Sequence, residues 1–428
     1  MKYKPKSGQH YLGMYTLVLE SYFTTKARQK LKKYLKDTVD VTINSSTLRH
    51  ELDANFFSED GQIVAFTDRN VLEVQEIIPK KNNPLYSKTN SNYQVIMLKE
   101  DGFWRIRHLT RTQLNFDKTR ILKKSPLVND TIILVDNQPF PIKGINYYPK
   151  DTPWDLFGDK FNAEVVDQDF HLIKNAGLNT IRIFIPYTDF GKEYVLPEKL
   201  EKLRLVMNTA EKVNLKVIVT LFDFYGNYAL EDWTFTHRHL EQIVDYLKDH
   251  KALLAWDLKN EPDLDFDSRG KSRVTSWLTE LVAQTKEIDS IHPITIGWSS
   301  PEAAKLLQDQ VDFLSFHYYG EISDFKERYK PLKAFQKPVV LQEFGLSSYR
   351  GLWAPFGNSE EDQALYYQNF QNILKKESVH FLSWTLYDFT NVPKGVVGSL
   401  PWRRAIQKHF GFIRTNGEKK PAFQFISN

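Results

Sequence analysis

The stretch Leu253-Leu-Ala-Trp-Asp-Leu-Lys-Asn-Glu-Pro262 indicates the fold most clearly. Its first residues, 253–258, are mostly apolar and do not alternate with polar ones, which is typical of a parallel strand covered on both faces. Amphipathic stretches with helical spacing precede and follow it, at 236–250 and 272–288. We therefore expect a buried strand between two helices, with the polar Asn260 and Glu261 at its end.

The same alternation of strand and helix signals repeats over the C-terminal two thirds of the chain. Apolar runs of strand length lie at 142–146, 180–185, 217–222, 253–258, 294–298, 313–316, 339–341 and 381–386. Amphipathic stretches lie between most of them, at 165–176, 197–213, 236–250, 272–288, 302–308 and 362–376. Eight such units in roughly 280 residues predict an α/β fold, a (β/α)8 TIM barrel. A doubly wound sheet is the alternative, but no glycine-rich turn follows its first strand.

The N-terminal part has a different composition and predicts a smaller α+β domain. Helical spacing at 11–35 precedes short alternating runs at 63–66, 71–78, 93–98 and 103–109, and Asp101-Gly102 is a hairpin turn signal. The segment 93–108 resembles the closing hairpin of a nuclear transport factor 2-like domain. We expect an accessory domain at 1–115, a polar, basic linker at 116–127, and the barrel at 128–428.

Composition excludes several classes of protein. The 428 residues include no cysteine, so disulfides, thiol catalysis and thiolate metal sites are absent. A formal charge of +4 is too weak for a dedicated nucleic-acid binder of this size. No apolar run reaches the ~18 residues that cross a bilayer, and no secretory signal is recognisable. The compartment stays open, with an extracytoplasmic (periplasmic or secreted) location favoured if a leader was removed. Membrane contact is expected only through a segment absent from this chain.

Two glutamates stand where barrel chemistry is expected. Glu261 ends the fourth strand and Glu343 the seventh, so both lie at the C-terminal mouth of the barrel and can face each other. Facing carboxylates suit glycosidic bond cleavage, because one donates a proton while the other stays ionised beside the developing oxocarbenium ion. A separation near ~5 Å implies a covalent intermediate and retention, whereas ~6.5–9.5 Å implies inversion.

Two motifs carry a family resemblance over roughly residues 130–428. Leu258-Lys-Asn-Glu-Pro262 and Leu341-Gln-Glu-Phe-Gly345 resemble the paired signatures of the clan A glycoside hydrolases, and within that clan the cellulase and β-mannanase group, family 5. The resemblance implies a retaining glycoside hydrolase acting on β-linked poly- or oligosaccharides, of endo-β-glucanase or β-mannanase type. It assigns Glu261 as general acid/base and Glu343 as nucleophile.

The resemblance also implies roles for the residues around this pair. Asn260 would hydrogen-bond the sugar 2-hydroxyl, Arg182 and Tyr319 would hold and polarise Glu343, His317 would line the cleft, and Trp384 would form the floor of a subsite. Asp223 and Trp298 are further candidates for substrate binding or support. Many family members have a histidine where this chain has Phe222-Asp-Phe-Tyr225, so the choice between glucan and mannan stays open.

Other functions are compatible with the same residues. A transglycosylase would use the same site with a sugar acceptor in place of water. A carbohydrate-binding protein on an inactive barrel would have lost a carboxylate or Arg182, and neither is lost. Catalysis by a glutamate pair needs no metal or cofactor, and the closely spaced histidines His237 and His239 alternate faces of a helix. We therefore expect a carbohydrate substrate, no cofactor, and no nucleic-acid partner.

Overall fold

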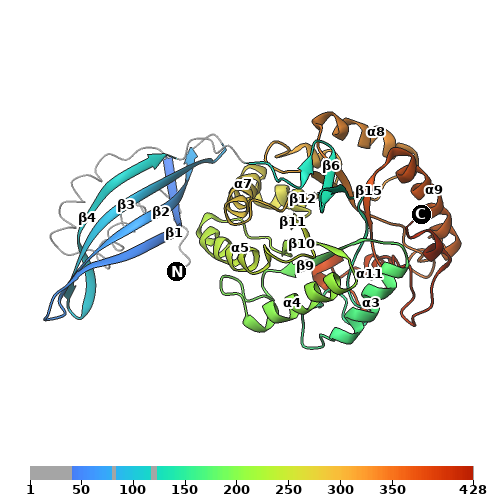
Figure 1. The fold of residues 1–428 in the computed structure, drawn as a ribbon, viewed down its shortest axis with the longest axis horizontal. Coiled ribbons are helices and arrows are strands. Elements are labelled where there is room, and N and C mark those ends of the chain that lie inside the picture. Colours follow the sequence, from blue (N-terminus) through green and yellow to red (C-terminus); the bar gives the residue numbers. More distant parts are fainter. Residues whose placement is uncertain (1–40, 80–82, 117–122, 428) are drawn as a thin grey trace. The chain divides into compact units, whose positions relative to one another are not determined.

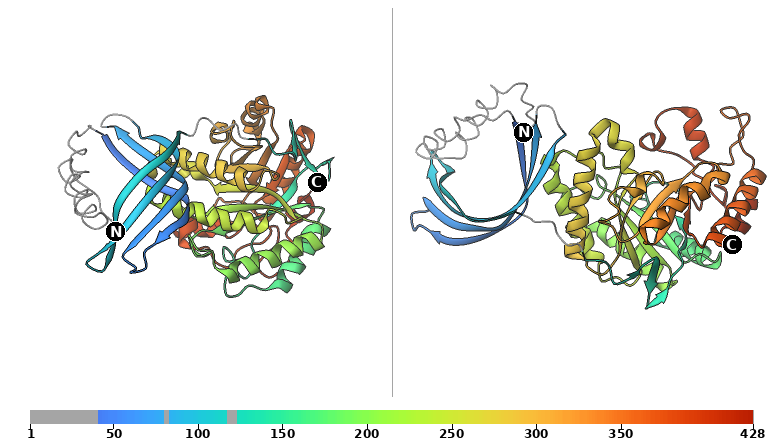
Figure 2. Two further views of the ribbon diagram at one scale, coloured as in Figure 1. Left: turned by 60° about the vertical axis from the view of Figure 1, so that its left-hand side comes forward. Right: turned by 90° about the horizontal axis from the view of Figure 1, so that it is seen from above.

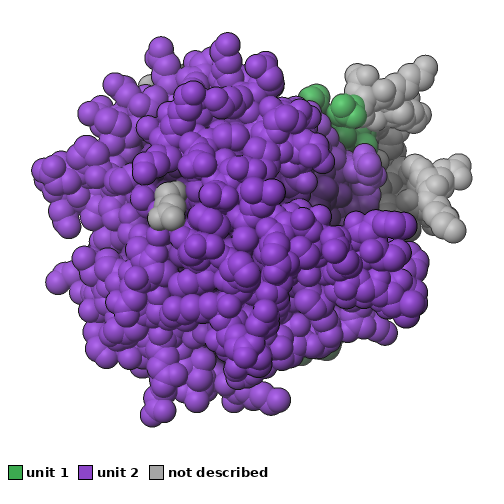
Figure 3. All heavy atoms as spheres, turned by 90° about the vertical axis from the view of Figure 1, so that its right-hand side faces the viewer, with its two compact units in different colours: residues 1–120, 229–234 green, residues 121–228, 235–428 purple. Residues whose placement is uncertain are grey.

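The computed structural model describes residues 41–79, 83–116 and 123–427. The chain divides into two compact units, Met1–Arg120 with Ala229–Thr234, and Ile121–Tyr228 with Phe235–Asn428, which Figure 3 colours separately. The helix expected at 11–35 lies outside the described residues. Within the described part of the chain, every helix is too short or too polar to cross a lipid bilayer.

The larger unit is a closed barrel of eight parallel strands with helices around it (Figure 1), which confirms the predicted (β/α)8 fold. Neighbouring strands pair in chain order, and the eighth strand closes the ring by pairing with the first. The strands are β8 (Lys143–Asn146), β9 (Thr180–Pro186), β10 (Lys216–Asp223), β11 (Leu253–Asn260), β12 (Ile294–Trp298), β13 (Leu314–Tyr318), β14 (Val339–Phe344) and β15 (His380–Ser383). Nearly all their residues are buried, as expected of strands covered on both faces.

Most connections between these strands contain a helix close to its predicted position. These helices are α3 (Ala163–Asn175), α4 (Pro197–Lys212), α5 (Trp233–Leu247), α7 (Lys271–Ile288) and α9 (Glu360–Glu377). Shorter helices that were not predicted are α6 (Phe266–Arg269), α8 (Phe325–Tyr329) and, after β15, α10 (Lys394–Val397) and α11 (Pro401–Gln407). Local signals set their starts: the Asn162 side chain caps α3 through two backbone N–H groups, and Ser359 forms a capping box with Asp362 at α9.

The helix predicted at 302–308 is wrong. Only a 3₁₀ turn, Ala303–Lys305, forms there, because Leu306 is extended and Leu307 has a φ of 51°. Such a left-handed residue interrupts α-helical hydrogen bonding. The connection before β14 contains short helical turns, among them α8, that the sequence analysis did not predict.

One end of the barrel is closed by a small sheet. Strands β5 (Val128–Asn129), β6 (Ile132–Val135) and β7 (Gln138–Pro139) pair in an antiparallel manner. Ile133 of this sheet is buried in a core cluster with Ile142 and Phe313, which directly precede β8 and β13. The apolar plug covers the N-terminal end of the barrel, so the C-terminal end is left for a site.

The smaller unit contains a four-stranded antiparallel sheet. Its strands are β1 (Val41–Phe57), β2 (Ile63–Pro79), β3 (Leu85–Glu100) and β4 (Phe103–Phe116), paired in chain order, and they curve together in Figure 2. The hairpin predicted at Asp101-Gly102 is confirmed, with φ of 52° and 81° at the two turn residues. The runs predicted at 63–66 and 71–78 belong to one strand with an irregular register after Asp68. β1 was not predicted, because its second half, residues 49–57, is exposed and contains many polar residues. The nuclear transport factor 2-like resemblance stays a prediction.

Candidate active site

A buried guanidinium organises the C-terminal mouth of the barrel. Arg182 on β9 is fully buried, and its Nη1 donates to Glu343 Oε1 at 2.6 Å and to Asn146 Oδ1 at 3.1 Å. Its Nη2 donates to Asp257 Oδ2 and to Asn260 Oδ1, each at 2.7 Å. This one cation therefore binds four side chains, which come from three other strands. A planar five-donor group is suited to this because it satisfies several acceptors in fixed directions.

The Arg182 network forms a polar layer inside an otherwise apolar barrel. Thr220 Oγ1 donates to Asp257 Oδ2 at 2.7 Å, and Gln342 Nε2 donates to the same oxygen at 3.2 Å. Burial by itself lowers the pKa of Arg182, but the charges and hydrogen bonds of Asp257 and Glu343 raise it above its ordinary value. A buried cation is stable only with such partners. The same hydrogen bonds that stabilise the Arg182 guanidinium therefore also fix the position of Glu343.

The other oxygen of Glu343 faces donors that are less constrained. Tyr319, immediately after β13, donates its phenol to Glu343 Oε2 at 3.0 Å. His317 Nδ1 lies 3.5 Å from the same oxygen. Glu343 is thus fixed through Oε1 by a guanidinium, while Oε2 has one phenol donor and a nearby ring nitrogen.

Glu261 has a different environment. It follows β11 in a left-handed conformation, with φ of 46°, and its N–H donates to the Gly297 carbonyl at 2.6 Å. Its side chain is 27% exposed, and Oε1 lies 2.8 Å from Nδ1 of the fully buried His317. A left-handed non-glycine residue is strained, and here it directs the carboxylate toward Glu343.

Glu261, His317 and Glu343 form one cluster. One carboxylate oxygen from each glutamate and a ring nitrogen of His317 all lie within 4.8 Å of one another. Three such donors are compatible with metal binding in principle, but Glu343 already accepts from Arg182 at 2.6 Å. A divalent cation there would lie next to a fixed guanidinium, so the donor set does not suit a metal.

Charges in this cluster shift the pKa of two of its members. Burial raises the pKa of Glu261, but the hydrogen bond and charge of His317, with Arg182 and Lys259, outweigh it and leave that pKa below its ordinary value. Burial lowers the pKa of His317, but the two glutamates outweigh it and raise that pKa. A proton on His317 is therefore stabilised between two carboxylates.

A cavity of about 530 Å³ opens above the two glutamates. One wall is aromatic: Tyr148 stacks on Phe184 at 5.1 Å and meets Trp384 edge-on at 6.3 Å. Segments after β15 supply another part of the lining. The lining residues are Tyr148, Trp154, Phe184, Asp223, Phe224, Tyr225, Gly226, Lys259, Asn260, Glu261, Leu264, Asp265, Tyr319, Glu343, Trp384, Gly395, Val396, Val397, Gln407 and Phe410. A cavity of this size with convergent polar groups is typical of a ligand site.

The structure brings most of the sequence candidates together around this cavity. Asp223, Asn260, Tyr319 and Trp384 line it with the two glutamates. Arg182 and His317 lie beneath it and contact the glutamates directly. Trp298 is the exception: it is buried in the core, where its ring lies 6.3 Å from that of Phe266, and it is not among the lining residues. Trp353 and Trp402, on the insertions after β14 and β15, are also outside the lining.

Sequence analysis missed several residues of the site. Asp257 and Lys259 are charged residues in the otherwise apolar strand β11, shortly before Glu261. Charged residues in an apolar strand were a usable signal for groups inside the barrel. Asn146 and Tyr148, near the end of β8, carried no comparable signal because each is a single residue whose partners lie far away in sequence.

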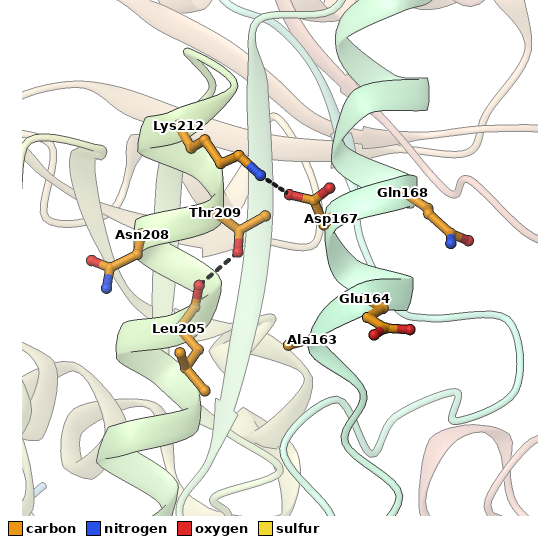
Figure 4. Close-up of a pocket in the computed structure, with 8 residues that line it drawn as sticks. All are labelled: Ala163, Glu164, Asp167, Gln168, Leu205, Asn208, Thr209 and Lys212. Carbon is orange, nitrogen blue, oxygen red and sulfur yellow. Dashed lines mark hydrogen bonds and ion pairs between the residues drawn. The ribbon is translucent and has the colours of Figure 1, made fainter.

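A second hollow, of about 450 Å³, lies between α3 and α4 (Figure 4). Lys212 donates to Asp167 at 2.9 Å across it, and Thr209 donates to the backbone of Leu205. Its lining residues are Ala163, Glu164, Asp167, Gln168, Leu205, Asn208, Thr209 and Lys212. Lys212 and Asp167 are exposed and neutralise each other. Unlike the barrel mouth, this hollow has no pair of facing carboxylates among its lining residues.

Comparisons with known proteins bear on the barrel unit. Residues 135–390 match the family model described as Cellulase (glycosyl hydrolase family 5). The β-glucuronidase of Rattus norvegicus is 25% identical over 329 residues, covering 69% of this chain and 45% of that protein. Mannan endo-1,4-beta-mannosidase 3 of Arabidopsis thaliana is 28% identical over 222 residues, covering 40% of this chain and 50% of that protein. This chain thus spans less than half the length of the curated β-glucuronidases that it matches.

Solved structures share the fold at low sequence identity. The exo-beta-1,4-mannosidase Op5Man5 from Opitutaceae bacterium strain TAV5 matches with a TM-score of 0.57 and 18% identity, covering 68% of this chain and 59% of that one. This likeness supports the architecture of the barrel.

Proposed function

This chain belongs to glycosyl hydrolase family 5, and on that premise we propose that it is a retaining glycoside hydrolase that cleaves β-glycosidic bonds by double displacement. Glu343 acts as the nucleophile and Glu261 as the general acid/base. The cavity above them receives the sugar, with Trp384 presenting a flat apolar face to the ring.

The separation of the two glutamates carries this proposal. Carboxylate oxygens of Glu261 and Glu343 lie within 4.8 Å of each other. Retaining enzymes place their carboxyl groups about 5–5.5 Å apart, whereas inverting enzymes need about 6.5–9.5 Å to admit a water molecule. The observed spacing supports direct attack by a carboxylate on the sugar.

In the first step, Oε2 of Glu343 attacks the anomeric carbon, and the bond to the leaving oxygen breaks. Oε2 is assigned this role because Oε1 is held by Arg182, while the phenol donor on Oε2 can release it. Glu261 gives its proton to the leaving oxygen. Substrate binding covers the exposed part of Glu261. This loss of solvent raises the pKa of Glu261 and so favours the protonated form that the first step needs.

In the second step, water attacks the anomeric carbon of the glycosyl ester, and the bond to Glu343 Oε2 breaks. Glu261 accepts the proton of that water. The ester has no negative charge, so the pKa of Glu261 falls after the first step and the group becomes a base. His317, hydrogen-bonded to Glu261 at 2.8 Å, stabilises its ionised form at this stage.

The substrate class follows from family membership and the aromatic wall. A β-linked glucoside or mannoside suits the cavity, and the mannosidase names among the relatives support the second choice. Residues of the segment after β15, such as Val396 and Phe410, form part of the cavity wall.

The test is substitution of the nucleophile with chemical rescue. Glu343→Ala should lower kcat on nitrophenyl β-glycosides on the order of 10⁵-fold, because the covalent route is lost. Added azide should restore turnover of a dinitrophenyl β-glycoside and release an α-glycosyl azide, identified by NMR. Glu201→Ala, an exposed glutamate on α4, is the matched control and should retain wild-type kinetics. Unchanged activity of Glu343→Ala, or a β-configured azide product, would refute the proposal.

A further inference from the structure

Lys259 is a buried cation in the wall of the cavity that the proposed mechanism does not use. It precedes Asn260 and Glu261, its residue exposure is 5%, and it lines the cavity. Nζ donates to the Asn260 carbonyl at 2.8 Å, and in the described part of the chain this is its one hydrogen bond. An ammonium has three donors, so two are left for a ligand.

Asp223 is the acidic counterpart on the neighbouring strand. It ends β10, is also 5% exposed, and lines the same cavity. Its Oδ2 accepts from the Tyr148 phenol at 3.3 Å, and its Oδ1 has no side-chain partner among the described residues. Because Thr220 of β10 pairs with Asp257 of β11, Asp223 and Lys259 lie at similar heights in the barrel.

The two charges are close enough to influence each other but do not form a direct ion pair. Each group shifts the pKa of the other toward the charged form, yet no contact within 4.0 Å joins them among the described residues. Burying an ammonium and a carboxylate costs free energy when their hydrogen-bonding capacity is only partly used. A ligand that both accepts from the ammonium and donates to the carboxylate would satisfy the two groups at once.

We propose that Asp223 and Lys259 form a pair that recognises adjacent hydroxyl groups of a neutral sugar and discriminates against uronic acids. A sugar hydroxyl is both donor and acceptor, so two neighbouring hydroxyls can bridge a carboxylate and an ammonium. This inference rests on the proposed function and adds the two residues that select a neutral sugar over an acidic one. It differs from what the β-glucuronidase names among the relatives would suggest.

The charge of the cavity excludes a sugar carboxylate. The charged side chains that line it are four carboxylates and one ammonium: Asp223, Glu261, Asp265, Glu343 and Lys259. Arg182 lies beneath and is engaged by Asp257 and Glu343. A uronate would add a fifth carboxylate, with Lys259 as the single cation among the lining residues and Asp223 close by. In a site of low dielectric constant, this like-charge repulsion strongly disfavours binding.

The experiment compares matched neutral and acidic substrates. Wild-type kcat/KM is measured with nitrophenyl β-mannoside, β-glucoside and β-glucuronide at one pH and ionic strength. The better neutral glycoside should exceed the glucuronide by about 100-fold or more. Lys259→Met should lower kcat/KM for the neutral glycoside about 10- to 100-fold, and Lys259→Arg less, because it keeps the charge. Asp223→Asn should reduce the preference for the neutral glycoside by about 10-fold.

Asp169→Asn serves as the matched control. Asp169 is a buried acid held by Tyr147 and Tyr387, and it does not line the cavity, so its loss should leave the ratio of neutral to acidic substrate unchanged. A wild-type preference for the glucuronide, or a loss in Lys259→Met that is greater for the glucuronide, would overturn the inference.

A binding measurement separates this inference from the proposed hydrolysis. Calorimetric titration of Glu343→Gln with the methyl β-glycosides of mannose, glucose and glucuronic acid reports affinity without turnover. Tighter binding of a neutral glycoside, weakened by Lys259→Met in the same background, supports the pair even if the wild type cleaves none of the substrates. Binding of none of them, or tighter binding of the glucuronide, overturns the inference whatever the turnover shows.

Discussion

The two glutamates that we propose as catalytic are close in space but are held very differently. Glu343 lies on the polar layer of the barrel, with Oε1 fixed by a fully buried guanidinium that also binds Asp257. Glu261 lies on a strained, left-handed turn, is partly exposed, and its side chain is hydrogen-bonded to His317. The contrast is consistent with the two roles that we propose, because a nucleophile needs a fixed charge, whereas an acid/base must gain and lose a proton.

The largest difference should appear in the dependence on the leaving group. Glu261→Ala should lower kcat/KM about 10²–10⁴-fold for phenyl and alkyl β-glycosides, which need a proton on the leaving oxygen. With a dinitrophenyl β-glycoside the loss should nearly vanish, because this leaving group departs without a proton. Glu343→Ala should be inactive on both kinds of substrate. An equal loss on both in Glu261→Ala would contradict the acid/base assignment.

The second difference concerns stability. Arg182→Met leaves Asp257 and Glu343 buried without their cation and should lower the free energy of unfolding by about 3–5 kcal/mol. Urea denaturation followed by far-UV circular dichroism measures this change. Arg414→Met removes an exposed arginine that pairs with Glu360 and Glu418, and should lower the free energy of unfolding far less. Equal losses in the two variants would show that the polar layer is not a structural element.

A third difference lies outside the Arg182 network and depends on pH. Burial raises the pKa of Asp223 from 3.8 to about 6, so the folded state binds that proton more tightly than the unfolded chain does. The stability that Asp223 contributes is therefore fully present below pH 3.8 and is lost as the pH rises toward about 6. Between pH 4 and 7, wild type should lose up to about 3 kcal/mol relative to Asp223→Asn in urea denaturation. Parallel pH curves for the two proteins would contradict a buried, ionising Asp223.

The smallest effect should come from Tyr319. Tyr319→Phe removes the phenol donor to Glu343 Oε2 but leaves the guanidinium on Oε1. Loss of one such hydrogen bond is worth about 0.5–1.5 kcal/mol, so kcat should fall about 3- to 10-fold with little change in melting temperature. A loss as large as that of Glu343→Ala would mean that the phenol, rather than the guanidinium, is the main support of the nucleophile.

Much of the fold was readable from local pattern. The apolar runs gave all eight barrel strands, since strands covered on both faces are continuous in sequence. The failures have local causes too. Leu307 interrupts the helix expected at 302–308, and β1 has too many exposed polar residues to be recognised as a strand. The barrel prediction succeeded because many similar units repeat the same signal.

The sequence by itself determined the chemical types at the strand ends, above all Glu261 and Glu343, because barrel geometry collects the carboxyl ends of parallel strands at one mouth. Only the tertiary structure decided how those groups interact. The Arg182 network, the place of His317 between two carboxylates, and the Asp223–Lys259 pair join residues from separate strands. Burial and distances of a few ångströms determine which of these groups are charged. Both quantities depend on how separate strands pack together, so no single segment of the sequence determines them.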